Sequence, residues 1–239
     1  MRDQIRISAK NLGQLALPDF CPRCFWLDMH MSARQKFPFP GIFNSIDSYT
    51  KQAVHGWFDV YGAMPRWFSA LSGVVGYTKA PTYHTFYIED ADTNIRLTGS
   101  PDDIFVCGDG SHLIVDYKTA KYTRNADALM PMYEVQLNAY ALISMQCEPS
   151  PVSGLVLIYM EPITDAAAAR TDINLRETGF AMGFQAHIHP IAIQPGIVTQ
   201  LMRTVREIYD LPLVPAGLAD CANCQYTNEL AALVTSQAQ

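Results

Sequence analysis

Long apolar runs are missing from this sequence of 239 residues, and none of its apolar segments reaches the length of a transmembrane helix. The first residues, Met1 to Arg6, lead into no apolar segment of the kind that signal peptides contain. Internal repeats are missing as well. We therefore expect a cytoplasmic protein that has no membrane among its partners.

Positive charge is also scarce, because 17 Lys and Arg face 23 Asp and Glu, which gives a formal net charge of −6. This balance argues against a protein that coats nucleic acid through an overall basic surface. It leaves room for a local basic strip, for which Lys118, Lys121 and Arg124 are candidates; the alternative is that they are ordinary solvated charges. With 49% hydrophobic residues, the chain is expected to fold as one domain over residues 1–239.

A charged pair ends the apolar run that begins at His112. Asp116 and Lys118 stand two positions apart in a predicted strand, so they point to the same face, and Tyr117 points to the other. Asp102 and Asp103 end the preceding hydrophobic segment, and strand alternation turns Asp103 away from Asp102. Asp102 beside Asp116 would form a group of hard oxygen ligands suited to a divalent metal.

A predicted helix follows this strand and carries Gln136 and Tyr140 at positions i and i+4, which places both on one helix face. Taken alone, Asp-x-Lys is a weak motif, and a strand end with a surface ion pair is the alternative interpretation. The combination of Gly99-x-x-Asp102, Asp-x-Lys and Gln-x-x-x-Tyr favours a functional site.

These motifs resemble those of the PD-(D/E)XK nucleases, and in particular the RecB-like branch that includes the CRISPR-associated adaptation nucleases. The resemblance implies that Asp102, Asp116 and the main-chain carbonyl of Tyr117 hold Mg²⁺ or Mn²⁺. It implies that Lys118 acts in catalysis and that Gln136 and Tyr140 complete the catalytic set.

Relatives often place a further metal-binding histidine in the helix expected at about residues 45–61. His55 is the candidate for that ligand in this chain, although Lys51, one turn earlier, could occupy the position instead. A lone histidine on a helix is also common as surface or core filler.

The resemblance predicts a metal-dependent DNA nuclease, either an exonuclease or an end-processing enzyme, that works in repair, recombination or CRISPR adaptation. Its expected substrate is single-stranded DNA or DNA ends. Aromatic side chains such as Tyr122, Tyr133 and Phe105 could stack on bases or simply pack in the core. The alternative function is a nucleic-acid-binding or scaffold subunit that does not cut.

Four of the six cysteines form two Cys-x-x-Cys pairs about 200 residues apart, namely Cys21 with Cys24 and Cys221 with Cys224. This arrangement favours one four-thiolate metal site that joins the termini. Zinc and a 4Fe–4S cluster both accept four thiolates. The resemblance favours 4Fe–4S, although many iron–sulfur relatives divide their cysteines as one plus three. Cys107 and Cys147 are expected to be buried small side chains.

The remaining pattern predicts an α/β fold with a mixed central sheet and flanking helices. We expect helices at about 131–145 and 195–209. We expect strands at 83–89, 94–106, 112–118 and 154–160, and an edge strand within 179–193. Residues 62–80 and 161–176 are expected to be irregular or loop-like. The resemblance implies a restriction-endonuclease-like core at about residues 83–160.

Overall fold

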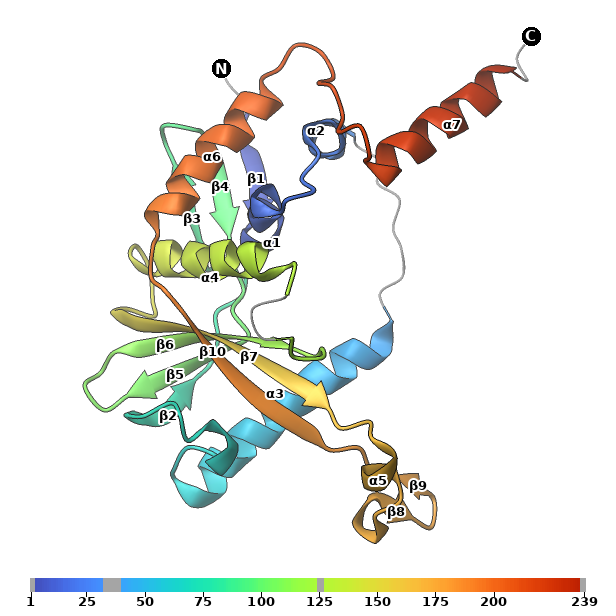
Figure 1. Cartoon of the computed structure of the whole chain (residues 1–239). Helices are drawn as coiled ribbons and strands as arrows, with labels where there is room; N and C mark the ends of the chain where they lie inside the picture. The colour runs from blue at the N-terminus through green and yellow to red at the C-terminus, as the bar shows by residue number, and fades with distance from the viewer. Residues whose placement is uncertain (1–2, 32–39, 124–126, 237–239) are drawn as a thin grey trace.

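Two β-sheets lie on opposite sides of helix α4 (Met130–Ser144), and helix α3 (Gly41–Tyr61) covers the far face of the larger sheet in this computed structural model (Figure 1). The structure describes residues 3–31, 40–123 and 127–236. The strands are β1 (Ile5–Ser8), β2 (Val74–Thr78), β3 (Tyr87–Asp90), β4 (Ile95–Thr98), β5 (Asp103–Cys107), β6 (His112–Lys118), β7 (Val152–Pro162), β8 (Leu175–Arg176), β9 (Gly179–Phe180) and β10 (Phe184–Ile191). The other α-helices are α1 (Ala9–Gly13), α2 (Pro22–His30), α5 (Ala166–Ala169), α6 (Gly196–Tyr209) and α7 (Ala222–Ser236).

The larger sheet has the strand order β10-β7-β6-β5-β2. Strands β6 and β7 are parallel, and the chain passes from one to the other through α4. The other neighbouring pairs are antiparallel. This arrangement confirms the expected mixed sheet with flanking helices and places β10 at an edge. Val115 of β6 is paired on both sides, with β5 and β7, and the residues that follow it, Asp116 to Lys118, are held by β7.

The smaller sheet has the order β1-β4-β3, and β1 runs parallel to β4. The buried Arg206 of α6 fastens this sheet, because its guanidinium donates hydrogen bonds to the main-chain oxygens of Asp3, Thr93 and Asn94. Parallel strands are joined by a long stretch of chain, here from β1 to β4, and local periodicity does not reveal that they pair.

Four expectations about the elements were wrong. The strand expected at 94–106 is two strands, β4 and β5, which belong to different sheets and are separated by residues 99–102. Residues 62–80, expected to be irregular, contain β2 and a short 3-10 helix (Arg66–Phe68). The strand expected at 83–89 begins only at Tyr87, and residues 161–176 include α5.

Two apolar cores occupy the two faces of the larger sheet, as strand alternation requires. Ile104 and Ile114 belong to the core that α4 shares with the smaller sheet. Phe105, Val115 and Tyr117 belong to the core on the face covered by α3. Neighbouring residues of β5 and β6 therefore point into different surroundings. None of the helices in the described part of the chain combines the length and apolarity needed to cross a bilayer.

Candidate active site

Asp102 and Asp116 lie on the same side of the larger sheet, at neighbouring strands. Asp102 immediately precedes β5, and its main-chain N–H donates to Val115 O at 3.2 Å. Its Oδ2 accepts a hydrogen bond from the Tyr117 N–H at 2.9 Å. Asp102 and Asp116 are each two residues from an isoleucine of the α4-side core, so strand alternation gives them the same face. The two predicted acidic residues are thus brought together at the carboxyl end of β6.

Asp116 is almost completely buried, with 3% of its surface exposed. Its Oδ1 accepts a hydrogen bond from Gln136 Nε2 at 3.0 Å, and its Oδ2 lies 2.5 Å from the Lys118 ammonium nitrogen. Burial raises the pKa of Asp116 to about 6, although the Lys118 charge opposes this shift and the Asp102 charge adds to it. A carboxylate that is costly to charge and close to a second carboxylate is typical of a functional site.

Helix α4 supplies the two other predicted residues of the site. Gln136 Nε2 also donates to the Tyr140 hydroxyl at 2.8 Å, and that hydroxyl donates to the main-chain oxygen of Ser100 at 3.3 Å. Gly99 makes room for this ring, because a Cβ at its position would lie 2.8 Å from Tyr140 Cδ1. The three motifs, far apart in the sequence, therefore meet in one hydrogen-bonded group around Asp116.

Lys118 extends from β6 over the ring of Tyr133, with its ammonium 4.4 Å from the ring centre. Of the aromatic residues considered for base stacking, Tyr133 is buried and Tyr122 is stacked on His187 with ring centres 4.4 Å apart. Phe105 is fully buried, so it packs in the core and is not available to a base.

Of the other candidates for a basic strip, Lys121 is exposed, and Arg124 lies outside the described residues.

Helix α3 carries both candidates for a further ligand, and the structure separates them. Lys51 contacts the Asp102 carboxylate, with its ammonium 2.8 Å from Oδ1, and contacts Asp47 at 2.9 Å. His55 Nε2 lies 2.9 Å and 3.0 Å from the two carboxylate oxygens of Asp103. His55 is therefore not brought to Asp102. Asp47 was not among the predicted residues, although its spacing of four from Lys51 is the signal of a helical ion pair.

Asp103 belongs to a second polar group on the α3-covered face. Its carboxylate accepts hydrogen bonds from the His55 ring and from the Tyr117 hydroxyl, the latter at 3.1 Å. The His55 ring is stacked on Tyr77, with ring centres 3.9 Å apart. Burial raises the pKa of Asp103, and its hydrogen bonds with His55 and Tyr117 oppose the shift. The alternation that turned Asp103 away from Asp102 is present as the sequence predicted.

The oxygen atoms of Asp102 and Asp116 are suitable ligands for a hard divalent cation. Both carboxylates offer oxygen atoms, which are the ligands that Mg²⁺ and Mn²⁺ prefer. Gln136 Oε1 is buried and has no hydrogen-bond partner within the described protein. An orphaned buried acceptor beside a carboxylate indicates a missing donor, such as a metal-bound water. Two lysines now neutralise the pair, so an incoming cation would share the carboxylates with them or displace them.

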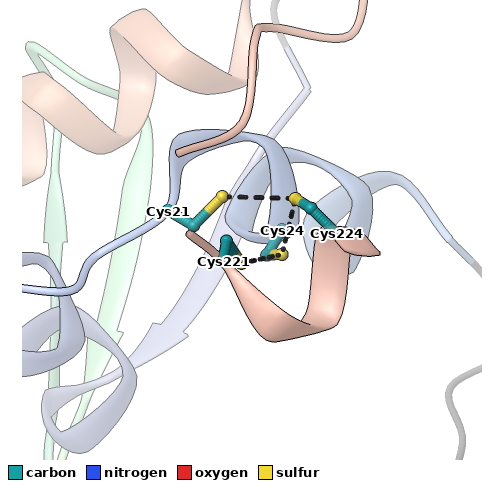
Figure 2. A group of neighbouring side chains, drawn as sticks. All are labelled: Cys21, Cys24, Cys221 and Cys224. Atoms are coloured by element: carbon teal, nitrogen blue, oxygen red, sulfur yellow. Dashed lines mark hydrogen bonds between the residues drawn. The ribbon is translucent and has the colours of Figure 1, made fainter. Parts of the chain in front are cut away.

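A group of four cysteines joins two segments near the ends of the chain (Figure 2). The four thiols of Cys21, Cys24, Cys221 and Cys224 point toward one another, and all their sulfur atoms lie within 4.8 Å. Three sulfur–sulfur distances are 3.5 to 3.6 Å. In the described part of the chain, this is the only set of three or more Cys, His, Asp or Glu ligands packed so closely. The predicted four-cysteine site is therefore formed.

The thiols of this group do not share one environment. Burial opposes charge on Cys21, but the main-chain N–H groups of Cys24 and Leu218 bring the pKa of Cys21 down to about 6. Burial and the neighbouring thiols raise the pKa of Cys24. One thiolate favoured by backbone donors gives the group a starting ligand for a cation.

Three comparisons with known proteins bear on this chain. A family model described as "PD-(D/E)XK nuclease superfamily" matches residues 43–228, a range that contains Lys51, Asp102, Asp116 and α4. The crystal structure of SSO0001 is similar with a TM-score of 0.47 and 11% identity, and the match covers 89% of this chain and 80% of that chain. The comparison with curated proteins found no match.

Proposed function

We propose that this chain, which belongs to the PD-(D/E)XK nuclease superfamily, is a metal-dependent nuclease that hydrolyses phosphodiester bonds in DNA. The observation that carries the proposal is the meeting of Asp102, Asp116 and Lys118 on one face of the sheet, with Gln136 bonded to Asp116. A nucleic-acid substrate follows from the superfamily, whereas DNA and the mode of cutting are our inference.

Asp102, Asp116 and the main-chain carbonyl of Tyr117 would hold Mg²⁺ or Mn²⁺. When bound, such an ion lowers the pKa of a coordinated water and stabilises negative charge on a phosphate. The protein's own part is to hold the two carboxylates in place, through the Tyr117 N–H on one and the Gln136 amide on the other. Burial of Asp116 keeps bulk water from screening its charge.

Lys118 is placed to act on the phosphate or on the attacking water. Its ammonium lies at Asp116 and over the face of Tyr133, so it is held near the carboxylates without being fully buried. A fixed positive charge of this kind can orient the nucleophile and neutralise charge that develops in the transition state. Gln136 and Tyr140 position Asp116 through hydrogen bonds, and Tyr140 anchors that group to Ser100.

Within the superfamily, the resemblance to the RecB-like branch and its CRISPR-associated members supports a role on single-stranded DNA or DNA ends. We place its work in repair, recombination or CRISPR adaptation, and its location in the cytoplasm. The net charge of −6 makes a broad grip on duplex DNA unfavourable, which supports engagement through a short segment near Lys118 and Lys121.

A nuclease assay on end-labelled strands tests this proposal. Single-stranded DNA, duplex DNA and single-stranded RNA are incubated with the protein in Mg²⁺, in Mn²⁺ or in EDTA. We expect metal-dependent shortening of DNA from its ends, lost in the variant Asp116→Asn and kept in Asp92→Asn, which changes an exposed turn aspartate in the same way. Equal cutting by both variants, or cutting in EDTA, would contradict the proposal.

One observation favours a second candidate, a nucleic-acid-binding subunit that does not cut. The Lys51 ammonium contacts Asp102, one of the two carboxylates that the metal needs. If this contact is permanent, DNA binding persists without any hydrolysis in either metal. Binding of a labelled strand, measured by fluorescence anisotropy beside the cutting assay, distinguishes the two functions.

For the four-cysteine site, we propose a single tetrahedral ion, with zinc as the metal, ahead of the 4Fe–4S cluster that the resemblance favoured. Zinc–sulfur bonds of about 2.3 Å give a tetrahedron whose edges are about 3.8 Å. The sulfur atoms of Cys24 and Cys221 lie 3.5 Å apart, close to that edge. A 4Fe–4S cluster puts four irons between its thiolates and therefore needs them more widely spaced.

Anaerobic purification followed by metal analysis and visible absorbance tests this assignment. One zinc per chain and a colourless solution are expected. A brown protein with about four irons per chain would establish the iron–sulfur cluster instead. In either case the bound metal is expected to contribute to folding, because it ties α2 to α7.

A further inference from the structure

Lys51 lies at an unexpected place in the proposed metal site. It is delivered by α3, the helix on the far face of the larger sheet, yet its ammonium contacts Asp102, which shares the opposite face with Asp116. About a quarter of the Lys51 side chain is exposed, and the same holds for Asp102. The contact is therefore at the open rim of the site, where ions from solvent can compete with it.

The two oxygens of the Asp102 carboxylate have different partners. Oδ2 accepts from the Tyr117 N–H, which is fixed in β6. Oδ1 accepts a hydrogen bond from the Lys51 ammonium at 2.8 Å. The main-chain donor cannot move without breaking the strand, whereas lysine has a flexible four-carbon stem. A metal that binds Asp102 through Oδ1 would therefore compete with Lys51 for that oxygen.

Asp47 offers the displaced Lys51 ammonium a second ion-pair partner. It precedes Lys51 by one helical turn and already lies 2.9 Å from the same nitrogen. Losing Asp102 to a metal would leave the Lys51 ammonium paired with Asp47, which it already contacts.

We propose that Lys51 is a positioning residue that occupies the cation position at Asp102 until a divalent metal binds, and that Asp47 retains its ammonium afterwards. The proposal rests on the proposed function, since it presupposes a metal held by Asp102 and Asp116. In the metal-free chain, Lys51 keeps the Asp102 carboxylate oriented. It also weakens metal binding, because the ion must compete with a charge already in place.

Metal titration without nucleic acid tests this directly. Mn²⁺ binding to the full chain is followed by the loss of its electron paramagnetic resonance signal. Lys51→Met is expected to bind Mn²⁺ about tenfold more tightly than wild type, an effect within the range of residues that support metal ligands. Lys51→Gln serves as a second variant that keeps a polar tip. Lys10→Met, which removes an exposed lysine from α1, should leave the affinity unchanged.

Asp47 is tested by combining variants. Asp47→Asn leaves Lys51 with Asp102 as its sole charged partner, so Mn²⁺ affinity should fall severalfold. Because this effect acts through Lys51, it should vanish in the double variant Asp47→Asn with Lys51→Met. If Asp47→Asn still weakens binding when Lys51 is absent, Asp47 itself binds the metal and the proposed role of Asp47 is overturned.

Two other outcomes separate this inference from the proposed function. If both Lys51 variants bind Mn²⁺ as wild type does, or more weakly, the positioning role of Lys51 is overturned while the metal site stands. If Asp116→Asn binds Mn²⁺ as well as wild type, or if wild type binds none, the metal site itself is contradicted.

Discussion

The adjacent aspartates Asp102 and Asp103 lie on opposite faces of the β5–β6 strand pair, and their surroundings differ. On the α4 side, Asp102 contacts Lys51 at the rim of the site, and the buried Asp116 contacts Lys118. On the α3 side, Asp103 is 1% exposed and is enclosed by His55 and Tyr117. One step along a strand thus separates a carboxylate placed for chemistry from one placed for structure. The following predictions test that division.

The largest effect is expected on the α4 side. Asp116→Asn keeps the shape of the side chain and removes its charge, so cutting should fall by about 10³-fold, at the upper end of what one preorganised group contributes. Lys118→Met should lower the cutting rate by a similar factor. Single-turnover cutting rates measure both effects, and circular dichroism verifies the fold. Rates within threefold of wild type would remove Asp116 from the chemistry.

The pH dependence of stability follows from the raised pKa of Asp116, about 6 against an ordinary 3.8. The folded chain binds this proton more tightly than the unfolded chain, so wild type loses stability as pH rises between those values. The variant Asp116→Asn has no carboxyl group at this position, so its stability does not depend on that proton. In EDTA, its stability relative to wild type should therefore increase from pH 4 to pH 7 by a few kcal/mol, at about 1.4 kcal/mol per pKa unit.

Urea unfolding of both proteins at several pH values measures that difference. The variant should be the more stable one at neutral pH, with the gap closing toward pH 4. A gap that stays constant, or one that widens toward acid, would show that Asp116 is not costly to charge.

For Asp103, we expect a substitution to lower the stability of the fold and to leave the cutting rate nearly unchanged. Asp103→Asn loses an acceptor for His55 or for Tyr117 and should destabilise the chain by about 2 kcal/mol, as expected for a buried hydrogen-bonding group left without its partner. Cutting should change less than threefold at a temperature where the variant is folded. Loss of cutting with unchanged stability would place Asp103 in the chemistry and erase the division between the faces.

The last prediction concerns the hydroxyl of Tyr140. Tyr140→Phe removes the acceptor of one Gln136 hydrogen bond and the donor to Ser100, while the bond from Gln136 to Asp116 can persist. We expect a roughly tenfold slower cutting rate, in keeping with loss of a supporting hydrogen bond. A loss as large as that of Asp116→Asn would mean that Tyr140 acts on the substrate itself.

Much of the site could be predicted because it depends on local periodicity. Strand alternation placed Asp116 with Lys118 and separated Asp102 from Asp103, and both arrangements are present. Helical spacing placed Gln136 beside Tyr140, as observed. The spacing of the two Cys-x-x-Cys pairs likewise predicted that the four cysteines lie together, as they do.

Other features could not be predicted because they depend on long-range packing. Lys51 and His55 are one helical turn apart and share a helix face, so only the docking of α3 on the sheet decides which one reaches Asp102. The break between β4 and β5 is equally invisible to alternation, since both parts read as strand. It arises where Gly99 makes room for Tyr140, a residue 41 positions later in the sequence.

The most direct measurement is the position of a bound metal. Crystals of the protein soaked in Mn²⁺ should show anomalous scattering from an ion held by the carboxylates of both Asp102 and Asp116, with the Lys51 ammonium withdrawn from Asp102 Oδ1. Well-ordered carboxylates with the ion bound beside Asp103 and His55, or with no ion near either aspartate at saturating Mn²⁺, would contradict the account.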